Sequence, residues 1–285
     1  MPLVYGPCGD STGGPAYIAA LRARRLLPTV RSATSSWGSL LPTNLADYIH
    51  PQRIWRANQI TEQRVVLTLA ESTNIGAVFF GWLDPGGANG ISQVSLEAND
   101  EDAWESPSFS LSLPLSDLLN PLTGRYQYAY VPDPNVPLLY RYVSLRFPAH
   151  TGTPVGLGQF ELFDTAGCFV SPRGSLEWGW TQGFLENELP NKSRERIAMG
   201  PRLLTVNFNW EMAYNYRDVT SLEVEDGLLE DQNLHTDVDD YVLVVRDCRF
   251  LSNYAVIGQA AAGGVQISSA LGVGATIALS YQEAC

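Results

Sequence analysis

The sequence predicts a mainly β protein with an antiparallel sandwich or barrel in its first half. Short runs of alternating apolar and polar residues dominate the chain, and a period of two is typical of half-buried strands. Turn sequences rich in Gly, Pro, Asn and Asp separate the runs, for example DPGGANG at Asp84–Gly90. Regular alternation of strands with helices, which would indicate a parallel sheet, is absent from the pattern.

The expected elements follow in chain order. Seven strands are predicted in the first half: Arg64–Ala70, Ile75–Leu83, Ile91–Glu97, Ser108–Leu113, Arg125–Val131, Leu139–Phe147 and Leu157–Phe163. In the second half we expect strands at Arg202–Trp210, Tyr241–Asp247, Tyr254–Gly258 and Ala275–Gln282. One helix is predicted near residues 218–229, because Val219, Leu222 and Leu229 share a face there. The segment Tyr17–Leu27 fits either a short helix or an extended arm.

These elements predict three parts. Residues 1–36 form an extended N-terminal arm, residues 37–172 a β-sandwich, and residues 173–285 a β-rich assembly domain with the one helix. The boundary between the last two parts is placed at the turn Ser171-Pro-Arg-Gly, where Pro and Gly interrupt the strand pattern.

The charge composition limits the classes of partner. The chain has 285 residues, of which 17% are charged, and a net charge of −12. An acidic protein lacks the positive field that nucleic acids and anionic membranes require, so we expect neither as a partner. Lys192 is the one lysine among 18 basic residues. This bias fits arginine pairs at subunit interfaces, and equally the codon bias of a GC-rich genome.

Membrane insertion is not expected either. The most apolar stretch, Tyr254–Leu279, is interrupted by several glycines, glutamines and serines, so it does not predict a membrane-spanning helix. The N-terminal residues lack the charged and apolar blocks of a signal peptide. We therefore expect synthesis in a cytoplasm.

The sequence predicts no catalytic or metal-binding residues. His50, His150 and His235 lie outside any nucleophile motif, and no phosphate-binding, dinucleotide-binding or zinc-protease motif occurs. The four cysteines, Cys8, Cys168, Cys248 and Cys285, are too widely spaced for a local metal motif. They are expected to be reduced in a cytoplasm, although their even number permits disulfides. No cofactor is expected.

Two clusters of carboxylates are candidate calcium sites, because calcium binds oxygen ligands. One comprises Asp100–Asp102 with Glu105, and the other extends from Glu223 to Asp240. Neither has the glycine and terminal glutamate of the twelve-residue calcium loop. A solvated acidic surface is the simpler interpretation of both.

Two groups of residues are candidates for contacts with a partner. Tyr126, Tyr128 and Tyr130 alternate, so a strand would place all three on one face. Such a face could stack on sugars, pack on another subunit or form part of a half-buried sheet. Arg22, Arg24 and Arg25 make the arm basic on an acidic protein. A basic arm can dock on an acidic neighbouring subunit or remain a solvated strand.

Several short motifs resemble galactose-binding-like (discoidin) jelly rolls. The stretch LLPTNLADYIHPQRIWRAN at Leu40–Asn58 is similar to the entry of that fold, through Asn44, Leu45, Asp47, Trp55 and Arg56. Later runs fit its core strands, with RYVSLRF at Arg141–Phe147 and the closing strand at Val155–Phe163. The resemblance implies a jelly-roll sandwich for residues 37–172. The family's ligand-binding loops cannot be matched residue by residue, so sugar binding is not carried over.

From Leu40 to Cys285 the chain also resembles tail-associated virion proteins of tailed bacteriophages. The similarity lies in the Ser171-Pro-Arg-Gly loop, the Trp178-Gly-Trp180 region and the strand motifs of the second half. It implies a non-enzymatic structural component of the tail, tail tip or baseplate. Such a subunit would assemble in the host cytoplasm into a symmetric oligomer, with copies of itself and other tail proteins as partners.

Two other functions stay open on the residues alone. A carbohydrate-binding or adhesion module would recognise a host surface glycan through the jelly-roll loops. A glycan-cleaving enzyme would use one of the acidic clusters.

Overall fold

The computed structural model describes most of the first half of the chain and the strands of the second. The described residues are 18–22, 25–46, 53–120, 124–130, 132, 138–163, 167–171, 174–188, 194–212, 241–246, 256–270 and 274–283. The protein is mainly β, and all of its paired strands in these ranges are antiparallel. The predicted fold class is confirmed.

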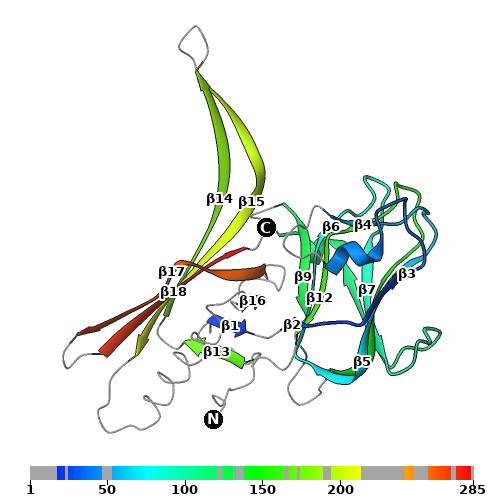
Figure 1. The fold of residues 1–285 in the computed structure, drawn as a ribbon, viewed down its shortest axis with the longest axis horizontal. Coiled ribbons are helices and arrows are strands. Elements are labelled where there is room, and N and C mark those ends of the chain that lie inside the picture. The colour runs from blue at the N-terminus through cyan, green and yellow to red at the C-terminus, as the bar shows by residue number, and fades with distance from the viewer. Residues whose placement is uncertain are drawn as a thin grey trace.

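The first half forms a sandwich of two antiparallel sheets (Figure 1). The five-stranded sheet has the order β3 (Val30–Ala33), β5 (Gln63–Ile75), β10 (Leu138–Phe147), β7 (Gln93–Asn99) and β8 (Phe109–Pro114). The four-stranded sheet has the order β2 (Arg25–Leu26), β12 (Gln159–Phe163), β6 (Ala77–Leu83) and β9 (Tyr126–Tyr130). A short pair, β4 (Trp55–Arg56) with β11 (Gly156–Leu157), a 3-10 helix η1 (Pro42–Ala46) and one helical turn α1 (Leu115–Leu118) complete it.

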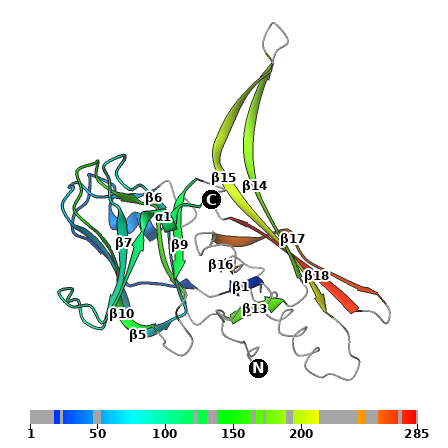
Figure 2. The same cartoon turned by 180° about the vertical axis from the view of Figure 1, so that it is seen from behind.

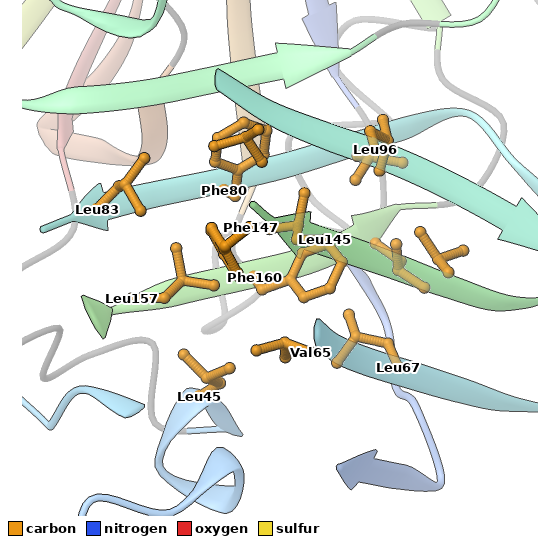
Figure 3. Packing of buried hydrophobic residues seen from close by; sticks show 14 of the residues in the cluster. Leu45, Val65, Leu67, Phe80, Leu83, Leu96, Leu145, Phe147, Leu157 and Phe160 are labelled. Atoms are coloured by element: carbon orange, nitrogen blue, oxygen red, sulfur yellow. The ribbon is translucent and has the colours of Figure 1, made fainter. Parts of the chain in front are cut away.

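The core between the two sheets is apolar, as the alternation of each strand requires. Val65 and Leu67 of β5 face Phe80 of β6 and Phe160 of β12 across the sandwich (Figure 3), and all four are fully buried. Burial of one such side chain stabilises the fold by about 1.5–3 kcal/mol. The core is therefore the main source of stability for this half.

The entry motif Leu40–Asn58 closes one end of the core. Leu45 and Trp55 are fully buried, and the Trp55 ring stacks on Phe147 with 5.8 Å between centroids. The indole N–H of Trp55 donates to the Ser35 carbonyl at 3.0 Å. The Asn44 amide donates to the carbonyls of Ser39 and Ile54. These residues thus hold the loop against the sandwich, while Asp47 lies outside the described residues.

A seven-stranded sheet accounts for the second half. Its order is β13 (Gly167–Ser171), β1 (Ile18–Arg22), β16 (Tyr241–Arg246), β17 (Val256–Ala270), β18 (Gly274–Glu283), β15 (Arg194–Met212) and β14 (Gly174–Glu188). Figures 1 and 2 show β14 and β15 as a long ribbon that extends away from the other strands. Only Thr205–Met212 of β15 pair with β18, so the part of β15 before Thr205 pairs with β14 alone.

All seven strands predicted in the first half are present, and so are the four predicted in the second. Strands β3, β4, β13 and β14 and the turn α1 were not predicted. Glycines and tryptophans mask the period of β14, and the other four elements have only two to five residues. The predicted helix near 218–229 lies outside the described residues, as do Cys8, Cys248 and Cys285. Cys168 belongs to β13.

The N-terminal segment is built into all three large sheets. Of the two alternatives for Tyr17–Leu27, the described residues form strands, not a helix: β1 lies between β13 and β16, and β2 pairs with β12. Strand β3 pairs with β5. Two strands of the seven-stranded sheet lie outside the range predicted for the second domain. Strand β1 lies in the range predicted as an arm, and β13 lies in the range predicted as the sandwich. The turn signal at Ser171 therefore follows β13, which already belongs to the second sheet.

The outer face of the four-stranded sheet is also buried. Phe79, Ala129 and Phe163 point away from the core, on the face opposite Phe80 and Phe160, yet they are at most 1% exposed. Because one chain is present, other segments of this chain must cover them. Glu161 lies on the same face and is fully buried, and Arg25 of β2 donates to both of its oxygens, at 2.6 and 2.7 Å.

Candidate functional site

Adjacent strands form a row of backbone pairs at one end of the sandwich. Arg56 of β4 pairs with Gly156 of β11, and Gly156 pairs in turn with Asp84, which follows β6. On the far side of β6, Leu83 pairs with Tyr126 of β9. Asp84 and Arg125 come next on these two strands. We call the surface formed by Arg56, Asp84, Arg125 and Trp82 the rim.

An ion pair forms across the strand that contains Gly156. Arg56 and Asp84 lie on either side of it, and Nη2 of Arg56 is 2.5 Å from Oδ2 of Asp84. A β-carbon at position 156 would lie 3.6 Å from Nε of Arg56, an ordinary van der Waals contact. The Arg56 and Asp84 side chains are 32% and 40% exposed, and Oδ1 of Asp84 also accepts from Gly86 N–H at 3.1 Å.

Trp82 has an unusual backbone conformation. It is the one non-glycine residue with positive φ, at 54°, within the described residues. It lies at a bulge, where the β6–β9 register shifts between Phe80 and Leu83. Left-handed backbone costs a residue with a β-carbon about 1–2 kcal/mol, and bulges at sheet ends commonly redirect a side chain. The half-buried Trp82 ring carries the guanidinium of Arg125, 4.4 Å from its centroid.

Two loops beside the rim hold each other rigidly. Thr153 N–H donates to the Gly86 carbonyl at 2.8 Å, and Thr151 N–H donates to the Asn89 carbonyl at 3.3 Å. The backbones approach so closely that a β-carbon on Gly152 would lie 2.1 Å from the Gly86 oxygen. Nε2 of His150 lies 2.8 Å from the Thr153 carbonyl oxygen, and Nδ1 lies 3.3 Å from that of Pro148. The ring acts here as a structural clamp.

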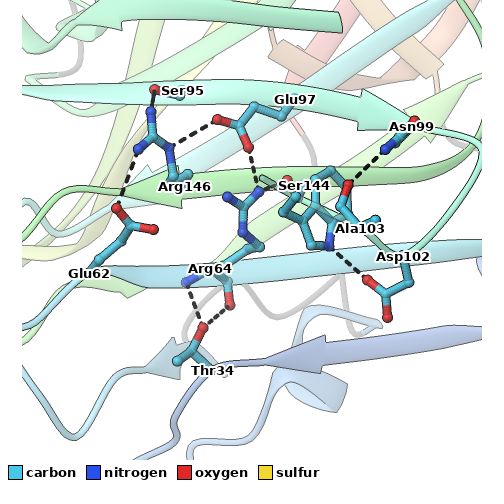
Figure 4. Close-up of polar contacts among 11 residues, drawn as sticks. Thr34, Glu62, Arg64, Ser95, Glu97, Asn99, Asp102, Ala103, Ser144 and Arg146 are labelled. Carbon is cyan, nitrogen blue, oxygen red and sulfur yellow. Dashed lines mark hydrogen bonds and ion pairs between the residues drawn. The ribbon is translucent and has the colours of Figure 1, made fainter. Parts of the chain in front are cut away.

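A second polar cluster covers the outer face of the five-stranded sheet (Figure 4). Glu97 accepts hydrogen bonds from Arg64 and, at 2.9 Å, from Arg146. Arg64 also donates to Ser144 at 2.7 Å and stacks under the Trp104 ring, 4.6 Å from its centroid. Both carboxylate oxygens of Glu97 are used within this cluster and its side chain is only 4% exposed, so its evident role is structural.

The acidic loop after β7 makes internal contacts. Asp100 accepts from the Ser72 hydroxyl at 2.7 Å, and Asp102 accepts from the Trp104 indole at 2.7 Å. In the described part of the chain, no three His, Cys, Asp or Glu residues are grouped as metal ligands. The stretch Glu223 to Asp240 lies outside it. No helix among the described residues has the length and apolarity to span a membrane.

The predicted tyrosines share one face of β9 and pack against the core. Tyr128 lies 6.1 Å from Phe80 and Tyr130 lies 5.3 Å from Phe109, measured between ring centroids. Tyr126, Tyr128 and Tyr130 are all half-buried. This placement matches a half-buried sheet face. Their role toward a partner stays a prediction.

The three arginines of the arm that were predicted to contact a partner have different surroundings. Arg25 pairs with Glu161 of its own chain, Arg22 ends strand β1, and Arg24 lies outside the described residues. Docking of Arg22 and Arg24 on another subunit stays a prediction. Nearby, burial lowers the pKa of Arg31, opposed by the charge of Glu161 and reinforced by that of Arg25.

Among known proteins, the chain shows similarity to solved structures only. No family model matches the chain, and no curated protein matches it. The lectin domain of lectinolysin complexed with Lewis b antigen is 17% identical, with 47% of this chain and 92% of that domain covered and a TM-score of 0.36. The CBM32 module of AlyQ, in complex with 4,5-unsaturated mannuronic acid, is 17% identical, with 49% and 97% covered and a TM-score of 0.37. A fucose-binding module of Streptococcus pneumoniae is 11% identical, with 50% and 95% covered and a TM-score of 0.36.

These three structures are carbohydrate-binding proteins by their descriptions, and none of the three is a phage tail protein. At such identities and TM-scores they carry no argument about the ligand of this chain.

Proposed function

We propose that the sandwich domain is a non-enzymatic glycan-binding module whose site is the rim. The observation that carries the proposal is Trp82, held in left-handed backbone conformation under Arg125 and two residues from the Arg56–Asp84 pair. Strained backbone at a bulky residue is concentrated at functional sites. A position where glycine would be cheapest instead carries the largest aromatic ring.

The chemistry of the rim suits a sugar. Arg125 covers one face of the half-buried Trp82 indole, and the other face can offer an apolar plane to the C–H face of a pyranose. Oδ1 of Asp84 accepts from Gly86 N–H at 3.1 Å and Oδ2 pairs with Arg56. The Asp84 side chain is 40% exposed, and each carboxylate oxygen has a second lone pair that can accept from a ring hydroxyl, while the guanidinium of Arg56 can donate to such hydroxyls. Hydrogen bonds to charged groups are about twice as strong as neutral ones. The rigid loops beside the rim keep these groups in place before binding, which reduces the entropy lost.

A glycan array with purified protein tests the proposal. We expect saturable binding by the wild type and its loss in Asp84→Asn and Trp82→Gly. Glycine relieves the positive φ at position 82, worth about 1–2 kcal/mol, so this variant should stay folded without the ring. Glu105→Gln, an exposed acidic residue in the loop after β7, is the matched control. Absence of wild-type binding, or unchanged binding by both rim variants, would contradict the proposal.

The non-enzymatic part has its own measurement. We expect no release of reducing ends when the protein is incubated with the glycans it binds. Release that persists in purified wild type and disappears on substitution of a single Asp or Glu would favour the glycan-cleaving alternative.

A second candidate, a self-assembling subunit of a bacteriophage tail, is favoured by the β14–β15 ribbon. Within the described residues, β14 has no partner along its outer edge, and Arg194–Leu204 of β15 pair with β14 alone. A two-stranded ribbon is at best marginally stable in water, and an open edge is a template for another chain. The virion location and tail-protein partners rest on the sequence resemblance. Light scattering after size exclusion should show an oligomer; a strict monomer at all concentrations would count against this candidate.

A further inference from the structure

Trp37 is an exposed tryptophan on a tight turn next to the rim. Its side chain is 55% exposed. The turn is closed by a hydrogen bond from Leu40 N–H to the Trp37 carbonyl at 2.9 Å, and Gly38 has φ of 54°. A single exposed aromatic side chain is not by itself a site. Trp37 matters because its turn pairs with Arg56 of the rim.

The turn continues the row of backbone pairs that forms the rim. Trp37 N–H donates to the Arg56 carbonyl at 2.8 Å, and Arg56 N–H donates to the Leu40 carbonyl at 3.2 Å. The order along the row is therefore the Trp37 turn, Arg56, Gly156 and Asp84. Paired strands lie about 4.8 Å apart, so the Trp37 turn is about 14 Å from Asp84 and about 19 Å from the β9 strand.

We infer that the rim binds an extended glycan of several sugar residues, with Trp37 as a second stacking platform at the far end from Trp82. The inference rests on the glycan-binding function proposed above and names the class of ligand. The Trp37 turn lies at one end of the row. Trp82 belongs to β6 at the other end, two residues before Asp84, and the partly exposed Arg56–Asp84 pair links the strands between the turn and β6.

The alternation of aromatic and charged groups favours a glycan over a protein partner. A sugar chain presents C–H faces and hydroxyls in alternation along its length, and so matches both kinds of group. The centre of a protein interface is instead depleted of charged residues. Here a charged pair occupies the centre of the row, and the aromatic groups lie at its ends.

Affinity as a function of glycan length tests the inference. The probes are chito-oligosaccharides, which carry no carboxylate, and oligogalacturonates, which carry one on each residue, each as a series of two to six residues. Binding is measured by calorimetry with the full chain. For wild type we expect affinity to rise with length in at least one series. Trp37→Ala should lower affinity for the six-residue member roughly three- to tenfold, the range for one aromatic contact, and should flatten the dependence on length.

Leu139→Ala is the matched control. Leu139 is 52% exposed, close to the value for Trp37, and pairs with Asn74 at the end of the sandwich opposite the rim. It should leave the length dependence as in wild type. A Trp37→Ala variant that keeps the full length dependence would overturn the inference and leave the proposed function standing. A wild type that binds neither these probes nor any array glycan would overturn both.

Discussion

Arg146 contacts two glutamates, and the difference between them gives a sharp prediction. Glu97 has a side chain that is 4% exposed and also binds Arg64, whereas the Glu62 side chain is 54% exposed and lies 3.3 Å from Arg146. We predict that Glu97→Gln destabilises the sandwich strongly and that Glu62→Gln does not. The two substitutions remove the same charge and keep nearly the same shape.

The magnitudes follow from burial. Removing one partner of a buried ion pair costs about 3–5 kcal/mol, because the other charge is left uncompensated. Glutamine at position 97 keeps one acceptor oxygen, and Arg146 is 36% exposed, so the expected loss is smaller, about 2–3 kcal/mol. An exposed pair contributes about 0–1 kcal/mol. The difference between the two variants should therefore be about 2 kcal/mol.

The assay is urea unfolding followed by tryptophan fluorescence and far-UV circular dichroism. Trp104 stacks on Arg64, so its emission should also report on the cluster around Glu97. An unchanged slope with a lower midpoint identifies a loss of stability. Equal shifts for the two variants, or a loss below about 1 kcal/mol for Glu97→Gln, would refute the reasoning from burial.

Three further predictions use the same unfolding measurement. Glu161→Gln should cost about 3–5 kcal/mol by removing the buried negative charge to which Arg25 donates two hydrogen bonds. A cost below about 1 kcal/mol, as for an exposed pair, would show that the contact is not buried. Gly152→Ala should cost about 1–3 kcal/mol, because the new β-carbon would lie 2.1 Å from the Gly86 carbonyl oxygen. Gly156→Ala is the control and should be nearly neutral, because its β-carbon would lie no closer than 3.4 Å to any neighbouring atom. Trp55→Phe should cost about 1–3 kcal/mol, because the indole hydrogen bond to the Ser35 carbonyl is lost and the phenyl ring is smaller. A neutral result would mean that water replaces that bond.

Strand positions in the first half were predictable because each strand has one core-facing set of residues. Apolar residues recur at every second position wherever one face of a strand meets the core, as at Val65 and Leu67. The tyrosines of β9 show the limit of this reasoning. Gln127 and Ala129, on the opposite face, are also buried, so alternation identified a shared face without indicating which face meets solvent.

The rim could not be predicted, because its contacts depend on which strands become neighbours. Arg56 and Asp84 are 28 positions apart, and they meet because both pair with position 156 in the sheet. Nothing local predicts left-handed backbone at Trp82, since sterics favour glycine there. The partner of Arg25 was equally hidden, because Glu161 is 136 positions away.

The position of β1 bears on how the chain folds during synthesis. This strand is the first described element, yet its two neighbours are β13, after the sandwich, and β16, near the end of the chain. The sandwich has all its strands once Phe163 has been made, so it can form on the ribosome. The second sheet must wait with β1 unpaired on at least one edge until β16 emerges. Pairing over such sequence separations is slow, and an open strand edge is prone to wrong pairing meanwhile. A chaperone or an early assembly partner would have most effect in that interval.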